Sequence, residues 1–381
     1  MDSDGDLRNK CVRVDLTKKH AKQIAPLVEE NKYAIPKHIG ECDEWTAYPL
    51  QPTLLKVIAL LSGRIMIGSP RNRNEEWCNT VIQYSMDAFG GGAKLRLLPT
   101  FLRPIGAALL PDIRRVKNHQ DVARRTVIPI VLARRSGEEK PQDDFLQWMM
   151  DSANENEQSP EFLAKQFLII SLASIHTTTM SLSKAIFDLL SHPEYIEPMR
   201  QEIERVYKEE GGVFTNAMSK KLELMDSFFK ESQRRSPPQP IGTPRIAVHP
   251  DGFTFSTGHH VPQGTEIIGC PWLAASFDPA ILEKPDEFDG YRFIKMRAQS
   301  AEADGRYTYA ATSLGHWGYG KHVCPGRFFA DTEMKIVLCD ILMKYDIRFA
   351  GSRKERPNDL VFELNIAADN DCQVEFRRRR L

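Results

Sequence analysis

The sequence lacks an excess of charge, because 51 Lys and Arg residues balance 51 Asp and Glu residues among 381. A neutral chain gives no electrostatic reason to expect nucleic acid as a partner. Long hydrophobic runs are also missing: the best stretch, residues 53–68, is interrupted by Lys56 and Arg64, so no transmembrane segment is predicted in this chain. The first residues, MDSDGDLRNK, are acidic and polar, which is not the pattern of a secretory signal peptide.

Cysteine is scarce, and its pattern suggests no pairing. The seven cysteines form no Cys-x-x-Cys motif and their number is odd, so a disulfide framework is not expected and a reducing compartment is favoured. A hydrophobic share of 41% excludes a wholly disordered chain. The length allows one large domain or about two to three smaller ones. It also suffices for a core deep enough to enclose a cofactor.

Helical periodicity dominates the first 135 residues. Apolar residues recur at helical spacing over three segments: 16–30, 54–67 and 75–89. Pro26 interrupts the first segment, and the run Gly90-Gly91-Gly92 is expected to break the chain after the third. Residues 136–160 are polar, which predicts a surface connection around a short helix at 144–150.

A long central helix is predicted from Ser159-Pro160-Glu161 to about His192. Ser suits the N-cap, Pro suits the first turn, and Glu suits the positive end of the helix dipole. The middle of this helix, FLIISLASI at 167–175, is apolar on all sides, so we expect it to be buried at the centre of the molecule. Two further helices are expected, from Pro193 to about residue 210 and over 217–235.

The β-rich pattern comes late in the chain. Short runs over 244–270, bounded by Gly and Pro, predict strands and hairpins, whereas 271–323 contains no long periodic segment. A last helix is predicted over 327–345. Strand-like pieces follow at 346–350, 360–365 and 373–377. The expected fold class is therefore mainly α with a small β region.

The segment WGYGKHVCPGRFFA at 317–330 carries the sharpest chemical signal. Cys324 stands where an irregular loop becomes a helix, and Pro325 suits the first turn of that helix. The helix N-terminus and the nearby Lys321 and His322 favour thiolate over thiol, which suits a nucleophile or a metal ligand. A lone cysteine is more often buried and inert, but the glycines and the proline at fixed offsets argue against that alternative.

At these residues the chain resembles the cytochrome P450 family of haem-thiolate monooxygenases. The family signature is Phe-Gly-x-Gly-x-(Arg/His)-x-Cys-x-Gly, and the chain matches it with Trp317 in place of Phe. The resemblance implies that Cys324 is the axial ligand of the haem iron, so this residue binds both the cofactor and its metal. It further implies that His322 and Arg245 pair with the haem propionates.

A Glu-x-x-Arg pattern at Glu231 and Arg234 falls on the helix predicted at 217–235. Residues three apart on a helix can pair, although an exposed pair of this kind is common and contributes little stability. The preceding run LMDSFF is apolar, which favours a buried helix. The resemblance implies that Arg292, in FDGYRF, joins the two in a charged cluster that fixes the loop carrying Cys324.

Ala173 and Thr177 lie four apart in the long helix and can face the same side. Thr177 could merely bond back to the carbonyl four residues earlier. The family pattern here is (Ala/Gly)-Gly-x-(Asp/Glu)-Thr-Thr, and the chain has Ser174 for the Gly and His176 for the acid. The resemblance implies that Thr177 helps to deliver protons to bound oxygen. His176 is a candidate relay beside it, because histidine can pass protons near neutral pH.

The resemblance covers nearly the whole chain, interpreted as one haem-thiolate monooxygenase domain over residues 1–381 that is shortened at the N-terminus. The membrane anchor and early sheet strands of the family are not found before residue 16. We therefore expect a cytochrome P450 fold that lacks these parts. In full-length relatives, the resemblance places the enzyme on the cytoplasmic side of the endoplasmic reticulum.

The implied reaction inserts one oxygen atom of O2 into a C–H bond of a lipophilic small molecule, with heme (iron protoporphyrin IX) as the cofactor. Electrons would come from NADPH-cytochrome P450 reductase. The stretches SLASIHTTTM and KHVCPGRFFA are most similar to filamentous-fungal members that oxidise terpenoid-type secondary metabolites.

Two alternatives to the monooxygenase stay open. One is a non-catalytic or degenerate haem-thiolate paralogue, which would bind haem without turnover. The other is a cysteine hydrolase that uses Cys324 with His322 or His316. The chain has no recognisable hydrolase motif, and a separation of two residues is poor for a general base and its nucleophile.

Overall fold

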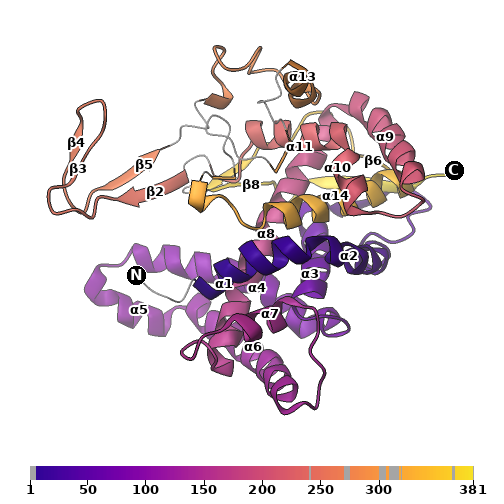
Figure 1. Ribbon diagram of the computed structural model, residues 1–381. Coiled ribbons are helices and arrows are strands. Elements are labelled where there is room, and N and C mark those ends of the chain that lie inside the picture. The colour runs from indigo at the N-terminus through magenta and orange to yellow at the C-terminus, as the bar shows by residue number, and fades with distance from the viewer. Residues whose placement is uncertain are drawn as a thin grey trace.

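The computed structural model describes residues 6–239, 242–269, 275–299, 306–308, 317–318, 320–362 and 365–380. Helices make up most of this part of the chain, and most strands come late in the sequence, as predicted (Figure 1). The N-terminal helices are α1 (Asp6–Lys10), α2 (Thr17–His38), α3 (Leu50–Met66), α4 (Glu75–Arg96), α5 (Arg103–Leu109), α6 (Pro111–Ser136) and α7 (Phe145–Ser152). Asn74 and Asp144 cap α4 and α7 by accepting hydrogen bonds from backbone N–H groups, each at 2.8 Å.

Two interruptions expected from the sequence are wrong. The helix α2 continues through Pro26 to its end at His38, and α4 continues through Gly90-Gly91-Gly92. Packing between helices outweighs the local preference, since α2 lies along α3 and α4 lies along α6. A Cβ at Gly91 would come within 2.8 Å of the Ile113 side chain, so the missing side chain lets α6 approach closely.

The long helix α8 (Pro160–Ser191) runs through the centre of the molecule, as predicted (Figure 1). The Ser159 hydroxyl caps it by accepting a hydrogen bond from the Phe162 backbone N–H at 3.0 Å. The helix contacts α3, α4 and α6, and also α11 (Glu223–Arg235) and α14 (Arg327–Lys344). These contacts place α8 in the interior, where it can form a wall of a cavity.

The helix predicted over 217–235 is in fact two helices, α10 (Asn216–Lys221) and α11. Leu222 between them has φ −77° and ψ 73°, which does not continue a helix. Thr215 caps α10 by accepting a hydrogen bond from the Met218 N–H at 3.0 Å. The helix α9 (Ile196–Glu209) precedes them as predicted, and α13 (Arg292–Gln299) is a short helix within 271–323, where the sequence predicts no long one.

The strands form small antiparallel sheets. One sheet has the order β1 (Thr46–Pro49), β9 (Gln373–Arg378), β6 (Tyr345–Phe349). The others are pairs: β2 (Gly242–Ile246) with β5 (Glu266–Gly269), β3 (Phe253–Thr254) with β4 (His260–Val261), and β7 (Leu360–Phe362) with β8 (Asn365–Ala367). Sequence reasoning misses β1, because this short strand exists only through its distant pairing with β9, where Thr46 faces Phe376. The pair β3–β4 lies at the tip of a projecting arm (Figure 1).

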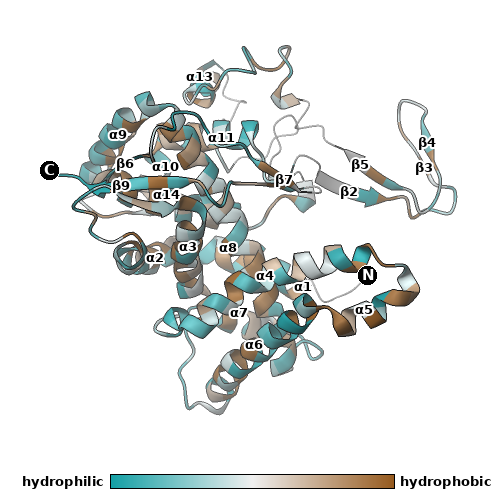
Figure 2. Ribbon diagram, turned by 180° about the vertical axis from the view of Figure 1, so that it is seen from behind, coloured by the Kyte–Doolittle hydropathy of each residue, from teal (hydrophilic) through white to brown (hydrophobic). Residues whose placement is uncertain are grey.

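A cluster of buried apolar side chains extends from Leu7 to Phe376 and connects the helices with the three-stranded sheet. Apolar residues are also exposed around α5, where much of the ribbon is brown in Figure 2. The exposed side chains there are Leu97, Phe101, Ile105 and Leu109. Within the described ranges, no helix combines the length and the apolar composition that a membrane crossing requires.

Candidate active site

The segment that carries Cys324 folds as a tight turn before α14. Gly318 and Gly320 have φ values of +82° and +60°, a backbone region that most side chains disfavour. A Cβ at Gly318 would also lie 3.0 Å from the His322 carbonyl oxygen. The Cys324 backbone N–H donates to the Trp317 carbonyl at 2.7 Å and closes the turn. The backbone shape that presents the cysteine therefore requires these glycines.

Trp317 anchors the turn to a neighbouring segment. Its Nε1–H donates to the Tyr307 carbonyl at 2.6 Å, and the two rings meet edge to face with centroids 5.1 Å apart. The Tyr307 backbone N–H donates in turn to the Asp226 carboxylate on α11 at 2.7 Å. The tryptophan that departs from the family signature thus makes a hydrogen bond that phenylalanine could not make.

A cavity of about 470 Å³ lies between Cys324 and α8. Thr177 of α8 lines it on one side, and Trp317 and Cys324 line it on the other. An adjacent cavity of about 240 Å³ shares these residues and extends toward Ile65 and Phe145. The larger volume is on the scale of small-molecule sites, and Cys324 and the central helix line this space together.

The two adjacent side chains that the sequence singles out on α8 point in different directions. Thr177 lines both cavities, and its hydroxyl donates to the Ala173 carbonyl at 2.8 Å. His176 turns to α4 instead, where its Nε2 lies 2.9 Å from the Ile82 carbonyl oxygen, and burial lowers the pKa of its imidazole. It is absent from the linings of these two cavities, so the structure does not bring His176 to the space that Thr177 lines. Consecutive residues of a helix point about 100° apart, so His176 can contact α4 while Thr177 lines the cavities.

Two basic side chains reach the larger of these cavities from different elements. Arg245 comes from β2, and His322 comes from the turn that precedes Cys324. The structure thus brings both predicted propionate partners to the space that Cys324 faces. Basic groups at the wall of a cavity favour a ligand that carries acidic groups.

The Cys324 thiol lies where charge is poorly solvated. Burial raises its pKa, while hydrogen bonds from the backbone of Gly326 and Arg327 and the charge of Arg327 act in the opposite direction. The Arg327 guanidinium donates to the carbonyls of Cys324 and Thr308, each at 2.9 Å. A bound metal cation would compensate the charge of such a thiolate directly.

The structure brings Glu231, Arg234 and Arg292 into one buried cluster. The Arg234 guanidinium meets the Glu231 carboxylate at 2.7 and 2.8 Å, and Arg292 Nε meets it at 3.0 Å. Both arginines also donate to backbone carbonyls, Arg234 to Pro285 and Arg292 to Glu287, each at 2.8 Å. None of the three charged residues lines the two cavities beside Cys324, so the cluster holds backbone and contacts no ligand there.

A second buried charged cluster escapes sequence reasoning. Lys335 of α14 donates to Asp226 at 2.7 Å and to the Ser219 carbonyl at 3.0 Å, and its ammonium lies 3.0 Å from Asp331. Burial opposes the charge on Lys335, but the two carboxylates outweigh it and raise the pKa of the ammonium. Asp226 also holds Tyr307, so this cluster connects α11 and α14 to the cysteine turn. No local pattern signals it, because Asp226 and Lys335 are 109 residues apart.

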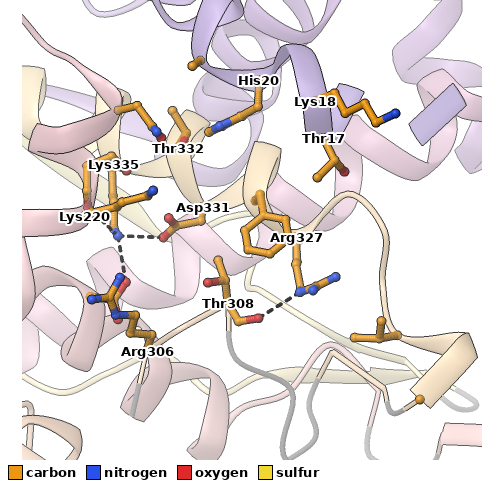
Figure 3. A pocket seen from close by; sticks show the side chains of 17 residues that line it. Thr17, Lys18, His20, Lys220, Arg306, Thr308, Arg327, Asp331, Thr332 and Lys335 are labelled. Carbon is orange, nitrogen blue, oxygen red and sulfur yellow. Dashed lines mark hydrogen bonds and ion pairs between the residues drawn. The ribbon is translucent and has the colours of Figure 1, made fainter. Parts of the chain in front are cut away.

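A third cavity, of about 810 Å³, adjoins this cluster (Figure 3). In Figure 3, Lys18 and His20 of α2 face Arg327 and Asp331 of α14 across it. Burial raises the pKa of Asp331 to about 7, and burial and the charge of Lys220 lower the pKa of His20. Basic side chains prevail in this lining, which is distinct from the space between Cys324 and α8.

The donor set indicates what the Cys324 site can hold. In the described part of the chain, no three His, Cys, Asp or Glu side chains are grouped so that they could bind a metal ion. A metal at Cys324 would therefore take most of its ligands from a cofactor such as a porphyrin. Gly326 faces open space, since a Cβ there would meet only Val12 at 3.9 Å. The residues present fit a flat cofactor with acidic groups and a metal that takes one thiolate, and this defines the class as a mainly helical haem-thiolate protein.

Comparisons with known proteins agree with this class. The family described as "Cytochrome P450" matches residues 53–367. Cytochrome P450 monooxygenase braC of Annulohypoxylon truncatum is 34% identical and aligns with 100% of this chain and 77% of its own length. Cytochrome P450 monooxygenase AN1598 of Emericella nidulans is 36% identical over 99% of this chain and 71% of its own length. An ent-kaurene oxidase of Gibberella intermedia is 34% identical over the same shares. The chain belongs to the cytochrome P450 family.

A solved structure supports the fold. The retinoic acid-bound cyanobacterial CYP120A1 superposes with a TM-score of 0.71 over 94% of this chain and 76% of that chain, at 18% identity. The predicted fold class, mainly α with a small β region, is confirmed.

The chain is accordingly a haem-thiolate monooxygenase, an oxidoreductase that uses O2 and electrons from a redox partner to act on small molecules. The predictions of family, enzyme class and cofactor are confirmed. Membership of this family excludes the cysteine hydrolase. Of its two candidate bases, His316 lies outside the described residues, and His322 lines the Cys324 cavity.

Proposed function

We propose that this chain hydroxylates a C–H bond of a lipophilic, terpenoid-type secondary metabolite of a filamentous fungus. The observation that carries the proposal is the space between Cys324 and α8, whose smaller part is lined largely by apolar side chains, including Ile65, Phe145 and Phe329. Such a lining favours a hydrocarbon-rich substrate, because burial of apolar surface drives its binding. The ent-kaurene oxidase among the relatives supports the same substrate class.

The predicted site residues other than His176 each have a role in this proposal that their positions allow. Haem, when bound, supplies oxygen activation, and a thiolate ligand favours O–O cleavage. Cys324 provides that thiolate from the turn before α14, and Arg245 and His322 bind the acidic groups of the cofactor. The cluster of Glu231, Arg234 and Arg292 holds the backbone at Pro285 and Glu287, which precedes the Cys324 turn in the sequence.

In this proposal the Thr177 hydroxyl holds and donates a proton at its Oγ1 atom. In the structure the Thr177 hydroxyl donates this proton in a hydrogen bond to the Ala173 carbonyl oxygen, with 2.8 Å between the two oxygens. Rotation of the side chain would direct the hydroxyl into the cavity that Thr177 lines, where it could donate to a bound ligand. His176 has no part in this step, because its Nε2 is hydrogen-bonded with the Ile82 carbonyl oxygen, 2.9 Å away.

The redox partner in this proposal is NADPH-cytochrome P450 reductase, and the chain works as a single monooxygenase domain. The reductase of eukaryotic relatives is bound to a membrane, so the proposal places the reaction at the cytoplasmic side of the endoplasmic reticulum.

The test combines the haem-loaded protein with reductase, NADPH and isotopically labelled O2, with ent-kaurene as the substrate probe. The proposal expects NADPH consumption and a product that carries one labelled oxygen atom. Haem binding without NADPH consumption or product, across a set of terpenoid hydrocarbons, would instead support the non-catalytic paralogue. Product from non-terpenoid probes alone would overturn the substrate class and leave the monooxygenase in place.

A matched pair of variants tests the role of Thr177. Thr179 makes the same bond, from its hydroxyl to the Ile175 carbonyl at 2.8 Å, but it is fully buried and does not line the cavities beside Cys324. Thr177→Ala should lower product formed per NADPH by about tenfold or more, as the loss of a positioned proton donor does, whereas Thr179→Ala should leave this ratio unchanged. Equal ratios in the two variants would contradict the assigned role.

A further inference from the structure

Lys184 of α8 lies about two turns after Thr177 and is almost fully buried, with 2% of its surface exposed. Its ammonium donates to three backbone carbonyls, those of Ile366 at 2.6 Å, Ser236 at 3.3 Å and Pro237 at 3.4 Å. A buried ammonium requires such partners, because leaving it unpaired is costly. Lys184 therefore holds two segments that are far apart in the sequence.

Both of these segments line the cavity that Cys324 faces. Pro238 and Gln239, which line the cavity, directly follow the acceptor Pro237. Asn365 of β8, which also lines it, directly precedes the acceptor Ile366. The Ile366 backbone N–H also donates to the Pro238 carbonyl at 2.9 Å, which joins the two segments directly. Lys184 itself is not part of this lining, so its influence on a ligand would pass through the backbone that it holds.

Charged side chains secure the same junction from its other side. Arg356 bonds to Asp188 of α8 at 2.6 Å and to Asp359, just before β7, at 3.1 Å. The Ser236 hydroxyl donates to Asp359, and the Ser232 hydroxyl on α11 donates to Asp188. The junction thus connects α8, α11 and the segment that leads into the β7–β8 hairpin.

We propose that Lys184 is a positioning residue that sets the shape of the substrate cavity by fixing the Pro238 segment and the β7–β8 hairpin against α8. It touches neither cofactor nor substrate. Without its three hydrogen bonds, the Pro238 segment and the hairpin would lose a shared contact that fixes them against α8. The Cys324 turn would keep its place, because Asp226 and Lys335 hold it from the opposite side.

The test uses the haem-loaded Lys184→Met variant and two probes that bind haem iron, the small imidazole and the larger 4-phenylimidazole. The affinity for 4-phenylimidazole should fall by about five- to tenfold, the range expected from lost hydrogen bonds, while that for imidazole changes by less than about twofold. Amide hydrogen exchange at Ile366 should accelerate. The reduced carbon-monoxide spectrum should keep its thiolate-type band.

Two further variants control this test. Lys165→Met makes the same change at an exposed position of α8 and should alter neither azole affinity nor exchange. Lys184→Gln keeps two N–H donors and should give intermediate azole affinities and an intermediate exchange rate. If Lys184→Met does not fold, Lys184→Gln is compared with the native protein in its place. Unchanged exchange at Ile366, or equal changes for the two azoles, would overturn the proposal. The inference rests on the haem site of the proposed function and not on its terpenoid substrate, so azole binding can fail or succeed independently of that substrate.

Discussion

The two walls of the Cys324 cavity are each secured by a buried lysine, but in different ways. Behind Cys324, Lys335 meets the carboxylates of Asp226 and Asp331, whereas on the α8 side Lys184 meets three backbone carbonyls. The carboxylates raise the pKa of Lys335 against the effect of burial, whereas burial lowers the pKa of Lys184 to about 8. The lysine behind the cysteine is thus held by ion pairs, whereas the lysine of the opposite wall is held by hydrogen bonds to carbonyls.

This difference matters for a monooxygenase. Breaking a buried ion pair leaves an uncompensated charge and is strongly destabilising, so the position of Cys324 tolerates little change. Individual hydrogen bonds to carbonyls contribute less, so changes at Lys184 cost less stability than changes at Lys335. One fold can therefore keep a constant ligand geometry while the cavity is adapted to a particular substrate.

The largest effect is expected for Lys335→Met, which leaves the Asp226 carboxylate buried without its cation. The free energy of unfolding should fall by about 3–5 kcal/mol, and the thiolate-type carbon-monoxide band should weaken, because Asp226 also holds Tyr307. Urea unfolding and the reduced carbon-monoxide spectrum measure the two effects. Lys344→Met is the matched control on α14, since Lys344 is exposed and its pair with Asp340 should contribute about 1 kcal/mol or less. Equal losses in the two variants would contradict the account.

A smaller loss is expected for Lys184→Met. Removing its hydrogen bonds should lower the free energy of unfolding by about 1–3 kcal/mol while the thiolate-type band remains intact. The same two measurements apply. If Lys184→Met loses the band as fully as Lys335→Met does, the two walls are not independent and the comparison fails.

Trp317→Phe, on the side of the cavity that presents Cys324, should lower the free energy of unfolding by a still smaller amount. The variant restores the residue of the family signature but loses the bond from Nε1 to the Tyr307 carbonyl. We expect a loss of about 1 kcal/mol in the free energy of unfolding and no change in the type of the carbon-monoxide band. A stability equal to that of the native protein would show that this hydrogen bond does not anchor the turn.

The last comparison concerns pH, where the two walls should respond with opposite sign. Burial raises the pKa of Asp331 from 3.8 to about 7, so between these values the folded state holds more protons and this contribution to stability falls as the pH rises. The pKa of Lys184 is lowered from 10.5 to about 8, so above pH 8 the unfolded state holds more protons and this contribution rises with pH. Unfolding free energies measured over a pH series check both slopes. Asp331→Asn should remove the fall in stability with rising pH below pH 7, and Lys184→Met should remove the rise above pH 8. Slopes identical to those of the native protein would refute the assignment.

The sequence predicts the parts of this molecule that depend on local chemistry. Ser159-Pro160 and the apolar run after it define α8, and the glycines around Cys324 define the turn, because caps and positive φ angles are properties of a few consecutive residues. The parts that depend on distant partners are missed. Gly91 remains helical because α6 packs on it. His176 turns away from the cavity because its ring meets α4.

The lysine contacts are missed for the same reason. Neither Lys184 nor Lys335 stands in a recognisable motif, and their acceptors come from segments that only the fold brings together. A buried lysine within an apolar helix is a signal that some acceptor must exist, but the sequence does not say which one.

The measurement that tests the central claim most directly is the absorption spectrum of the purified, reduced protein under carbon monoxide. The native chain should give the thiolate-type Soret band, and Cys324→Ser should lose it. Cys78→Ser, which changes a half-buried thiol on α4 that donates to the Asn72 carbonyl at 3.0 Å, should keep it. A native spectrum of histidine-ligated or free haem, or a thiolate-type band that survives in Cys324→Ser, would contradict the assignment of this cysteine as the iron ligand.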